Sequence, residues 1–301
     1  MYSYILDGLV KHNQINNVEL YLQSLQDYVK QLRQSYKVNQ VRVDYSDSNI
    51  QAAYLLAYYP QYTEMTFKVI CDVNYNYLHS CFVGSRDLQA CFFCAGPAPE
   101  TVAWVKYLSS NYSPAKYAVA HTYDIAASTW SRSREITKNV VANLCADWKF
   151  TLNGYNLNLC QKNAFPSIRD IIQTSNLFFV QNCLNEFISN PEIFIKNIDF
   201  LITEMPANSI IIIADLNYKS VVSLMEQIEA YVSISTKSKI IRSYTAGDIH
   251  LHSTLKLPPI IRNNLLTGAD GLIPRSNINF KYLAIQKLPK AVEPSYADIP
   301  F

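Results

Sequence analysis

Long apolar runs are missing from this sequence, and charge of either sign is sparse. The longest unbroken apolar stretches, such as 210–214, are far shorter than the ~20 residues of a membrane-spanning helix, so we expect no membrane span. Twenty-six Lys and Arg stand against 24 Asp and Glu, a formal charge of +2. This balance gives no strong basic field for phosphates, and it neither requires nor excludes a nucleic-acid partner.

Paired cysteines and a secretion signal are also missing. The N-terminus lacks the basic-then-apolar pattern of such a signal, and the seven cysteines are odd in number and lie mostly in apolar runs. We therefore expect reduced thiols and a cytoplasmic protein. Cys91 and Cys94 have no second Cys-x-x-Cys pair to complete a metal site, and we interpret them as small buried side chains. His250 and His252 are likewise interpreted as structural or substrate-loop residues, so no metal is predicted.

What the sequence does contain is 49% hydrophobic residues, enough for a sizeable core, and 22 tyrosines. In residues 1–37 and 50–73, apolar side chains recur at steps of three and four, which predicts amphipathic helices. The polar run 44–49 predicts a helix start near Asp47, and Pro60 predicts a bend or restart. We expect residues 1–85 to form a helical N-terminal extension that covers a cofactor cleft.

From residue 88 onward, short apolar runs alternate with longer helical ones, which is typical of a parallel sheet built from βα units. The fold class is therefore α/β, a Rossmann-like seven-stranded and mostly parallel sheet flanked by helices, over residues 86–288. The last two strands are expected to pair as an antiparallel ribbon at one edge, with nothing strongly helical between them. Residues 289–301 are expected to form a Pro-rich tail. The expected strands are 88–94, 117–123, 155–160, 177–180, 209–215, 239–244 and 280–286, and the expected helices are 101–108, 131–145, 166–174, 191–205 and 218–231.

The densest chemical signal, residues 92–101, lies where the first predicted strand gives way to a helix. Ligands bind at such a place in open parallel sheets, because the carboxyl end of the strand and the amide-rich start of the helix face one crevice. Gly96 permits a close approach of the backbone, and the flanking prolines suit a helix start. Glu100 lies in the first turn of that helix, where its carboxylate could accept a hydrogen bond from an ammonium group.

An acidic residue, Asp124, ends the second predicted strand. A carboxylate at this position can accept hydrogen bonds from both hydroxyls of a ribose. A dinucleotide would require a fuller Gly-x-Gly-x-x-Gly loop, whereas here only Gly96 is present and no Lys or Arg is near. A nucleoside without a diphosphate therefore fits better.

Residues 40–287 resemble the class I S-adenosylmethionine-dependent methyltransferases. The run 96–100, Gly-Pro-Ala-Pro-Glu, is similar to the first motif of that family, and 123–125 with Trp130 is similar to the second. The chain departs from the family pattern where Cys94 and Ala98 replace glycines and Phe92 replaces a frequent acid.

The resemblance implies an enzyme that uses S-adenosyl-L-methionine and carries its site on the loops after the first four strands. By position, Gly96 contacts the methionine moiety, Asp124 the ribose and Gln161 the adenine, and Tyr45 and Tyr54 are candidates to cover the cofactor. A helix cap followed by packing aromatics is the other interpretation of residues 44–60. The predicted cofactor-binding residues are Cys94, Ala95, Gly96, Pro97, Glu100, Asp124, Ile125, Trp130, Gln161, Gln181 and Tyr45.

The loop after the fourth predicted strand would face the methyl acceptor. It is not the Asp/Asn-Pro-Pro-Tyr box associated with methylation of exocyclic nitrogens. Asn182 and Glu186 are the candidates to orient or deprotonate an acceptor. The favoured acceptor is a small molecule, and the alternatives are a non-catalytic module that binds S-adenosylmethionine or a nucleoside, and an RNA methyltransferase. The sequence indicates neither the acceptor atom nor an oligomeric state.

Overall fold

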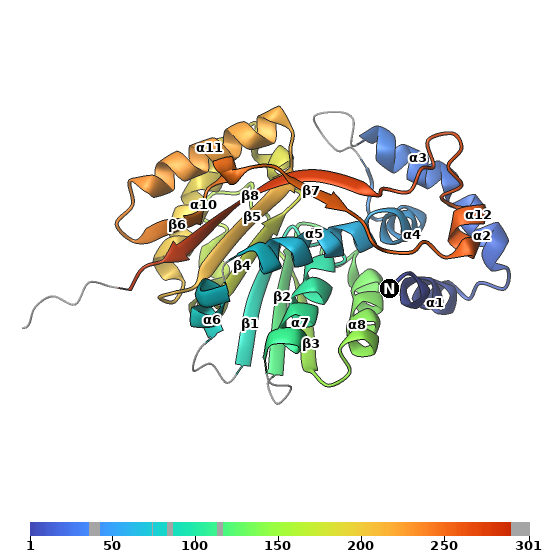
Figure 1. Ribbon diagram of the computed structural model, residues 1–301, viewed down its shortest axis with the longest axis horizontal. Coiled ribbons are helices and arrows are strands. Elements are labelled where there is room, and N and C mark those ends of the chain that lie inside the picture. Colours follow the sequence, from blue (N-terminus) through green and yellow to red (C-terminus); the bar gives the residue numbers. More distant parts are fainter. Residues whose placement is uncertain (36–42, 74, 83–86, 113–116, 290–301) are drawn as a thin grey trace, which may run out of the picture.

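The computed structural model describes residues 1–35, 43–73, 75–82, 87–112 and 117–289 (Figure 1). The Pro-rich tail predicted for 289–301 lies almost entirely outside the described residues, and so does the boundary placed at residues 85 and 86. No helix within the described ranges has both the length and the apolar character needed to cross a bilayer.

A mixed, mostly parallel sheet forms the centre of the molecule, and its described part has eight strands in the order β3-β2-β1-β4-β5-β8-β6. β1 to β5 run parallel, β8 is antiparallel to β5 and β6, and the short β7 pairs with β8. The order reverses between β1 and β4, where doubly wound sheets bind their ligands. The fold is Rossmann-like, as the sequence predicted. The strands are β1 Asp87–Phe93, β2 Tyr117–Asp124, β3 Lys149–Asn156, β4 Leu177–Gln181, β5 Ile210–Leu216, β6 Ser238–Arg242, β7 Ile249–His252 and β8 Asn277–Lys287.

Two expectations about the sheet were wrong. The third strand is Lys149–Asn156 and not 155–160, because this edge strand is largely polar and half exposed and lacks the apolar run that signals a buried strand. The sheet also has an eighth strand, β7, which lies with the short helix α12 (Pro259–Asn264) in the stretch where no helix was expected. The antiparallel pairing of β6 with β8 was predicted correctly.

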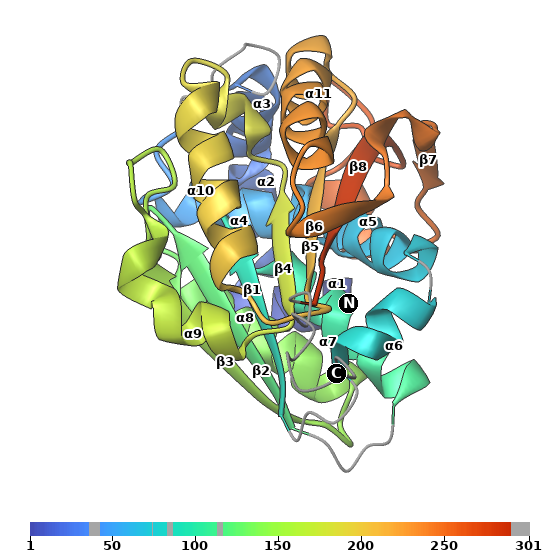
Figure 2. The ribbon, with the colours of Figure 1, turned by 90° about the vertical axis from the view of Figure 1, so that its left-hand side faces the viewer.

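Helices cover both faces of the sheet. α9, α10 and α11 pack on one face through one apolar cluster, as Figure 2 shows. The other face belongs to a larger cluster that also contains side chains of the N-terminal helices. The ranges are α9 Arg169–Thr174, α10 Pro191–Glu204 and α11 Lys219–Ser233 on the first face, and α4 Ser48–Ala57, α5 Tyr59–Asp72, α6 Tyr75–Phe82, α7 Pro99–Asn111 and α8 Ser131–Leu144 on the second.

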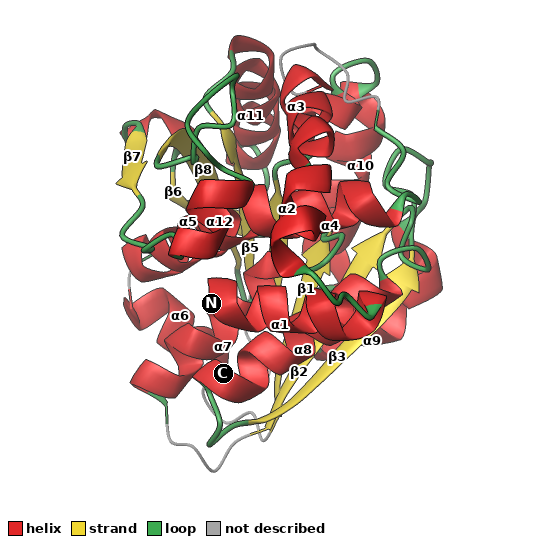
Figure 3. Cartoon of the chain, turned by 90° about the vertical axis from the view of Figure 1, so that its right-hand side faces the viewer, coloured by secondary structure: helices red, strands yellow, loops and turns green. Residues whose placement is uncertain are grey.

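The first 35 residues form three helices and not one continuous segment: α1 Tyr2–Asn13, α2 Val18–Ser24 and α3 Gln26–Ser35. Gln14 ends α1 in a left-handed conformation, and the side chain of Asn17 caps α2. α2 lies beside α12 (Figure 3), where the side chain of Gln23 donates to that of Asn264. α4 begins after Asp47, which caps it, and the helix restarts at Tyr59 and Pro60, as predicted.

Candidate functional site

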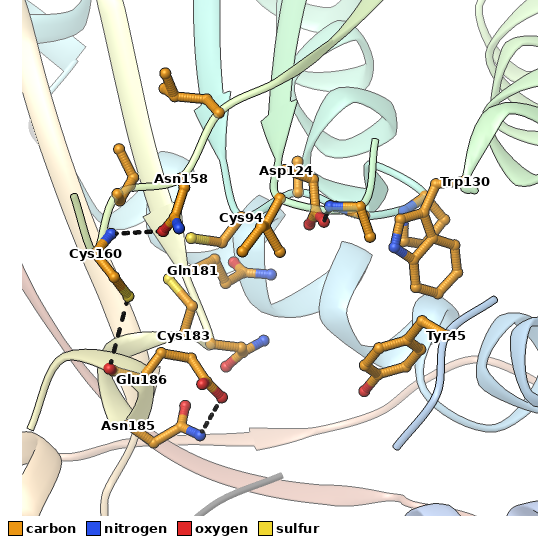
Figure 4. Close-up of a pocket in the computed structure, with 18 of the residues that line it drawn as sticks. Tyr45, Cys94, Asp124, Trp130, Asn158, Cys160, Gln181, Cys183, Asn185 and Glu186 are labelled. Atoms are coloured by element: carbon orange, nitrogen blue, oxygen red, sulfur yellow. Dashed lines mark hydrogen bonds between the residues drawn. The ribbon is translucent and has the colours of Figure 1, made fainter. Parts of the chain in front are cut away.

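A cavity of about 310 Å³ opens at the carboxyl ends of β1, β2, β3 and β4 (Figure 4). Every residue predicted to bind the cofactor lines it except Gln161, and both candidate catalytic residues, Asn182 and Glu186, line it as well. The charged residues in its described lining are Glu100, Asp124 and Glu186. We call it the acidic cavity.

A pair of hydrogen bonds fixes the loop after β1 against the end of β2. The backbone N–H of Gly96 donates to Oδ2 of Asp124 at 2.9 Å, and the N–H of Ala126 donates to Oδ1 at 2.8 Å. The N–H of Ala95 also donates to the carbonyl of Tyr123, at 3.1 Å. A carboxylate oxygen has two lone pairs, so each oxygen of Asp124 keeps an acceptor position for a ligand hydroxyl.

Left-handed backbone recurs at every second residue of the same loop. φ is +55° at Cys94, +49° at Gly96 and +65° at Ala98. Such angles suit glycine and are strained for other residues, and strain of this kind gathers at functional sites. The two positions where the sequence departs from the family's glycines therefore keep the backbone that glycine would adopt.

An aromatic wall closes one side of the acidic cavity. The ring of Trp130 lies 5.1 Å from that of Tyr45 and 5.7 Å from that of Tyr54, between centroids. A Cβ added to Gly96 would lie 3.3 Å from the indole of Trp130. The amide of Gln51, on α4, ties this wall together because it donates to the carbonyls of Tyr45 and Thr129 at 2.7 and 2.9 Å.

The acids of the cavity have raised pKa values. Burial raises the pKa of Glu100 to about 8, and the nearby charge of Asp124 adds to the effect. Burial also raises the pKa of Asp124, although the hydrogen bonds from Ala126 and Gly96 oppose the shift. Oε2 of Glu100 is buried and has no hydrogen-bond partner among the described residues. A cationic ligand would supply the missing partner and favour the ionised carboxylate.

The loop after β4 forms the opposite wall. Both amide atoms of Asn182 are buried without a partner in the described part of the chain, and its backbone is left-handed, with φ +55°. The side chain of Gln181, in contrast, is engaged, because Oε1 accepts a 2.7 Å hydrogen bond from Thr66 of α5. Asp215, at the end of β5, accepts from the backbone N–H of Leu184 at 2.8 Å and so braces this loop.

Three thiols face the cavity, those of Cys94, Cys160 and Cys183, as Figure 4 shows. Burial raises the pKa of Cys183, and the neighbouring Cys94 adds to the shift. The described residues contain no cluster of three His, Cys, Asp or Glu side chains arranged to hold a metal ion. Cys91, in contrast, is buried in the sheet and contacts the hydroxyl of Ser175 at 3.3 Å.

The adenine side of the site was placed too late in the sequence. Gln161 does not line the cavity, and its carbonyl accepts a hydrogen bond from Asn197 of α10 at 3.1 Å. The residues that do line this side are 157–160, which directly follow the true third strand. Asn158 accepts from the N–H of Cys160 at 2.9 Å, an Asx turn that shapes the loop. Had the polar run 149–156 been recognised as the strand, Asn158 would have been the candidate.

No protein-family model matches the sequence, and no curated protein matches it. Several solved structures share its general arrangement, among them three that are described as methyltransferases or methylases. A putative class I S-adenosylmethionine-dependent methyltransferase from Listeria monocytogenes is 12% identical and has a TM-score of 0.42, with 98% of this chain and 90% of that chain covered.

The second is an S-adenosylmethionine-dependent methyltransferase from Clostridium acetobutylicum, 9% identical with a TM-score of 0.40, covering 77% of this chain and 99% of that one. The third is an rRNA methylase from Streptococcus thermophilus, 7% identical with a TM-score of 0.36, covering 71% and 95%. The function of this chain has to be inferred from its own cavity, because the identities and TM-scores are low.

Proposed function

We propose that this chain is an S-adenosylmethionine-dependent methyltransferase that binds its cofactor in the acidic cavity and methylates a small molecule. The observation that carries the proposal is the Gly96–Asp124 hydrogen bond beside an open cavity, at the place where the strand order reverses. A sharp turn and a second-strand acid thus lie together, with room for a nucleoside between them and the aromatic wall.

The lining fits the chemistry of this cofactor, part by part. Asp124 has free lone pairs for the ribose hydroxyls, and the neighbouring Ile125, whose side chain is 69% exposed, offers an apolar surface to the adenine. The unpartnered Oε2 of Glu100 is an acceptor for the ammonium group of the methionine moiety. The N-terminal extension covers the cleft through Tyr45 and Tyr54.

Bound S-adenosylmethionine supplies a methyl group on a positively charged sulfur, ready for attack by a nucleophile. The chain has to align the acceptor and keep water away. The buried amide of Asn182 orients the acceptor, and Glu186 accepts its proton. Partial desolvation raises the pKa of Glu186, which makes its carboxylate a better base, and the amide of Asn185 holds that carboxylate at 3.0 Å.

Isothermal titration with S-adenosylmethionine and with its demethylated product, S-adenosylhomocysteine, tests the proposal. Asp124→Ala should weaken the binding of both by about 1.5–3 kcal/mol, because it removes charge-assisted hydrogen bonds and frees the loop. Asp147→Ala removes an exposed aspartate outside the cavity and is the matched control. If the unmodified chain binds neither compound, the proposal is wrong.

The same titration separates an enzyme from a module that only binds. Binding of S-adenosylhomocysteine without methyl transfer to any member of an acceptor panel would favour the non-catalytic role. An RNA methyltransferase would instead bind RNA with a steep dependence on salt, because each phosphate contact releases a counterion.

A further inference from the structure

A second cavity, of about 440 Å³, lies between α3, the junction of α4 and α5, the end of β5 and the loop before β8. Its volume is in the range of small-molecule sites. Its charged lining consists of Lys30, Arg33 and Arg275, with Asp270 as the acid among the described residues. We call it the basic cavity.

Two guanidinium groups converge on this cavity. Nη1 of Arg275 donates to the hydroxyl of Tyr62 at 2.9 Å, and its Cζ lies 5.4 Å from the centre of the Tyr62 ring. Arg33 donates to the carbonyl of Ile273. Burial lowers the pKa of Arg33, and repulsion from Arg275 contributes to the same direction. Within the described ranges, neither guanidinium forms an ion pair with a carboxylate.

Like charges held together in a partly buried space favour an anion between them. An arginine fork matches the two oxygens of a carboxylate or a phosphate, and the attraction is stronger where water is partly excluded. Tyr58 and Tyr218 add aromatic surface to the wall, and the Tyr218 side chain is 50% exposed. A small ligand with a flat body and an anionic group fits this lining.

The two cavities share a layer of tyrosines. Tyr54 lines the acidic cavity and Tyr58 lines the basic one, and their rings stack with centroids 5.7 Å apart. Both cavities also lie at the carboxyl edge of the sheet, because Asn182 follows β4 and Tyr218 follows β5. A molecule seated in the basic cavity is therefore a neighbour of whatever occupies the acidic one.

We propose that the basic cavity holds the anionic group of the methyl acceptor, which is a small molecule carrying a carboxylate or a phosphate. This inference rests on the proposed function, since it names the class of acceptor. A small molecule is favoured over RNA because the cations gather in one hollow and the chain has a formal charge of only +2, whereas RNA needs cations spread along a surface.

Three probes of similar shape test the inference on the full chain in the presence of saturating S-adenosylhomocysteine. They are benzoate, phenyl phosphate and the neutral benzyl alcohol, titrated by ligand-observed NMR. We expect at least one anion to bind about tenfold or more tightly than benzyl alcohol. The tighter of the two anions identifies the carboxylate or the phosphate as the natural group. Equal binding of all three probes would overturn the inference.

Variants place the anion in the basic cavity. Arg33→Met should weaken binding of the preferred anion about tenfold, and Lys30→Met about threefold, because Lys30 is already paired with Asp27 at 3.3 Å. Arg132→Met, which removes an exposed cation of α8 outside both cavities, should change nothing. Arg275→Met is a second variant, with a melting curve to show that it folds without the Tyr62 hydrogen bond.

The affinity for S-adenosylhomocysteine is measured in the same variants and should stay unchanged. If S-adenosylhomocysteine binds and Arg33→Met leaves anion binding intact, the inference fails and the proposed function stands. If S-adenosylhomocysteine does not bind the unmodified chain, the proposed function fails, and the acceptor role of the basic cavity fails with it. If a short single-stranded RNA displaces the anions and loses affinity in the same variants, the partner is RNA and the small-molecule assignment is overturned.

Discussion

The acidic and basic cavities lie on either side of stacked tyrosines, yet their charges are opposite. Glu100, Asp124 and Glu186 line the first, whereas Lys30, Arg33 and Arg275 line the second. The formal charge of +2 conceals this separation because it averages the two sites. The comparison teaches that the balance of charge over a whole chain says little about what any one site attracts.

Each cavity also holds its charges at a cost that a ligand of opposite charge would relieve. In the acidic cavity, burial and neighbouring acids raise the pKa of Glu100, whereas in the basic cavity burial and a neighbouring cation lower the pKa of Arg33. Both shifts disfavour the charged side chain. A cationic cofactor in one cavity and an anionic acceptor in the other would reverse both.

Blocking one cavity while sparing the other is the strongest test. Gly96→Val should reduce the affinity for S-adenosylhomocysteine at least about a hundredfold, roughly 3 kcal/mol, because φ is +49° and the added side chain meets Trp130. Binding of benzoate or phenyl phosphate should persist. Gly268→Val is the control, since Gly268 also has a positive φ, +84°, but has open space around it. Calorimetry and NMR give the two affinities, and loss of both ligands together in a folded variant would contradict separate cavities.

The buried acid should make stability depend on pH. The folded pKa of Glu100, about 8, lies above the ordinary value of 4.5, so between these values the folded chain binds more protons than the unfolded chain. The contribution of Glu100 is therefore complete below about pH 4.5 and is lost as pH rises toward 8, by up to about 1.4 kcal/mol per pH unit.

Glu100→Gln should remove this slope. Urea unfolding at pH 5.5, 6.5 and 7.5 measures it, and the variant should gain stability relative to the unmodified chain as the pH increases. Glu192→Gln, an exposed glutamate in the first turn of α10, should run parallel to the unmodified chain. A parallel course for Glu100→Gln as well would show that Glu100 is ionised in the folded chain.

Occupancy of the acidic cavity should protect its thiols. Cys160 is exposed and lines this cavity, whereas Cys71 is exposed on α5 and lines neither. At S-adenosylhomocysteine concentrations of about ten times Kd, about one site in eleven stays empty, so alkylation of Cys160 by iodoacetamide should slow about tenfold. Cys71 should react at an unchanged rate, and benzoate should protect neither, as peptide mass spectrometry would record. Equal protection of both cysteines would point to a general change in the fold.

The smallest effect concerns the shape of the loop around Gly96. Ala98→Gly should change the free energy of unfolding by less than about 1 kcal/mol, since relief of the positive φ offsets the lost methyl contact. Ala103→Gly, at an equally buried position inside α7, should destabilise by about 1.5–2 kcal/mol because no strain is relieved there. Equal losses in urea unfolding would mean that the loop is unstrained.

Sequence reasoning placed the ends of β1 and β2 well because their signals are local. A buried run followed by Gly96 or Asp124 needs no knowledge of the rest of the fold. β3 was misplaced because an edge strand with polar residues such as Thr151 and Asn153 carries no apolar run, and Gln161 was misassigned as a result.

The basic cavity could not be predicted at all from the sequence. Arg33 and Arg275 are far apart in the chain, and they meet only because α3 packs beside the loop before β8. The brace from Asp215 to Leu184 was missed for a similar reason, since it links the ends of two different strands. Local patterns indicate elements, whereas meetings of this kind depend on the packed arrangement.

The hydrogen bonds of Gln51 and Gln181 also determine how ligands travel. The first anchors α4 to the turn at Thr129, and the second anchors α5 to β4 through Thr66. A roof fastened at both positions stays shut during turnover, because lifting it would strip buried amides of their partners. Entry and departure then proceed sideways past the exposed rim at Ile125 and Cys160, so mutations there should alter the rates of exchange while the roof keeps its place.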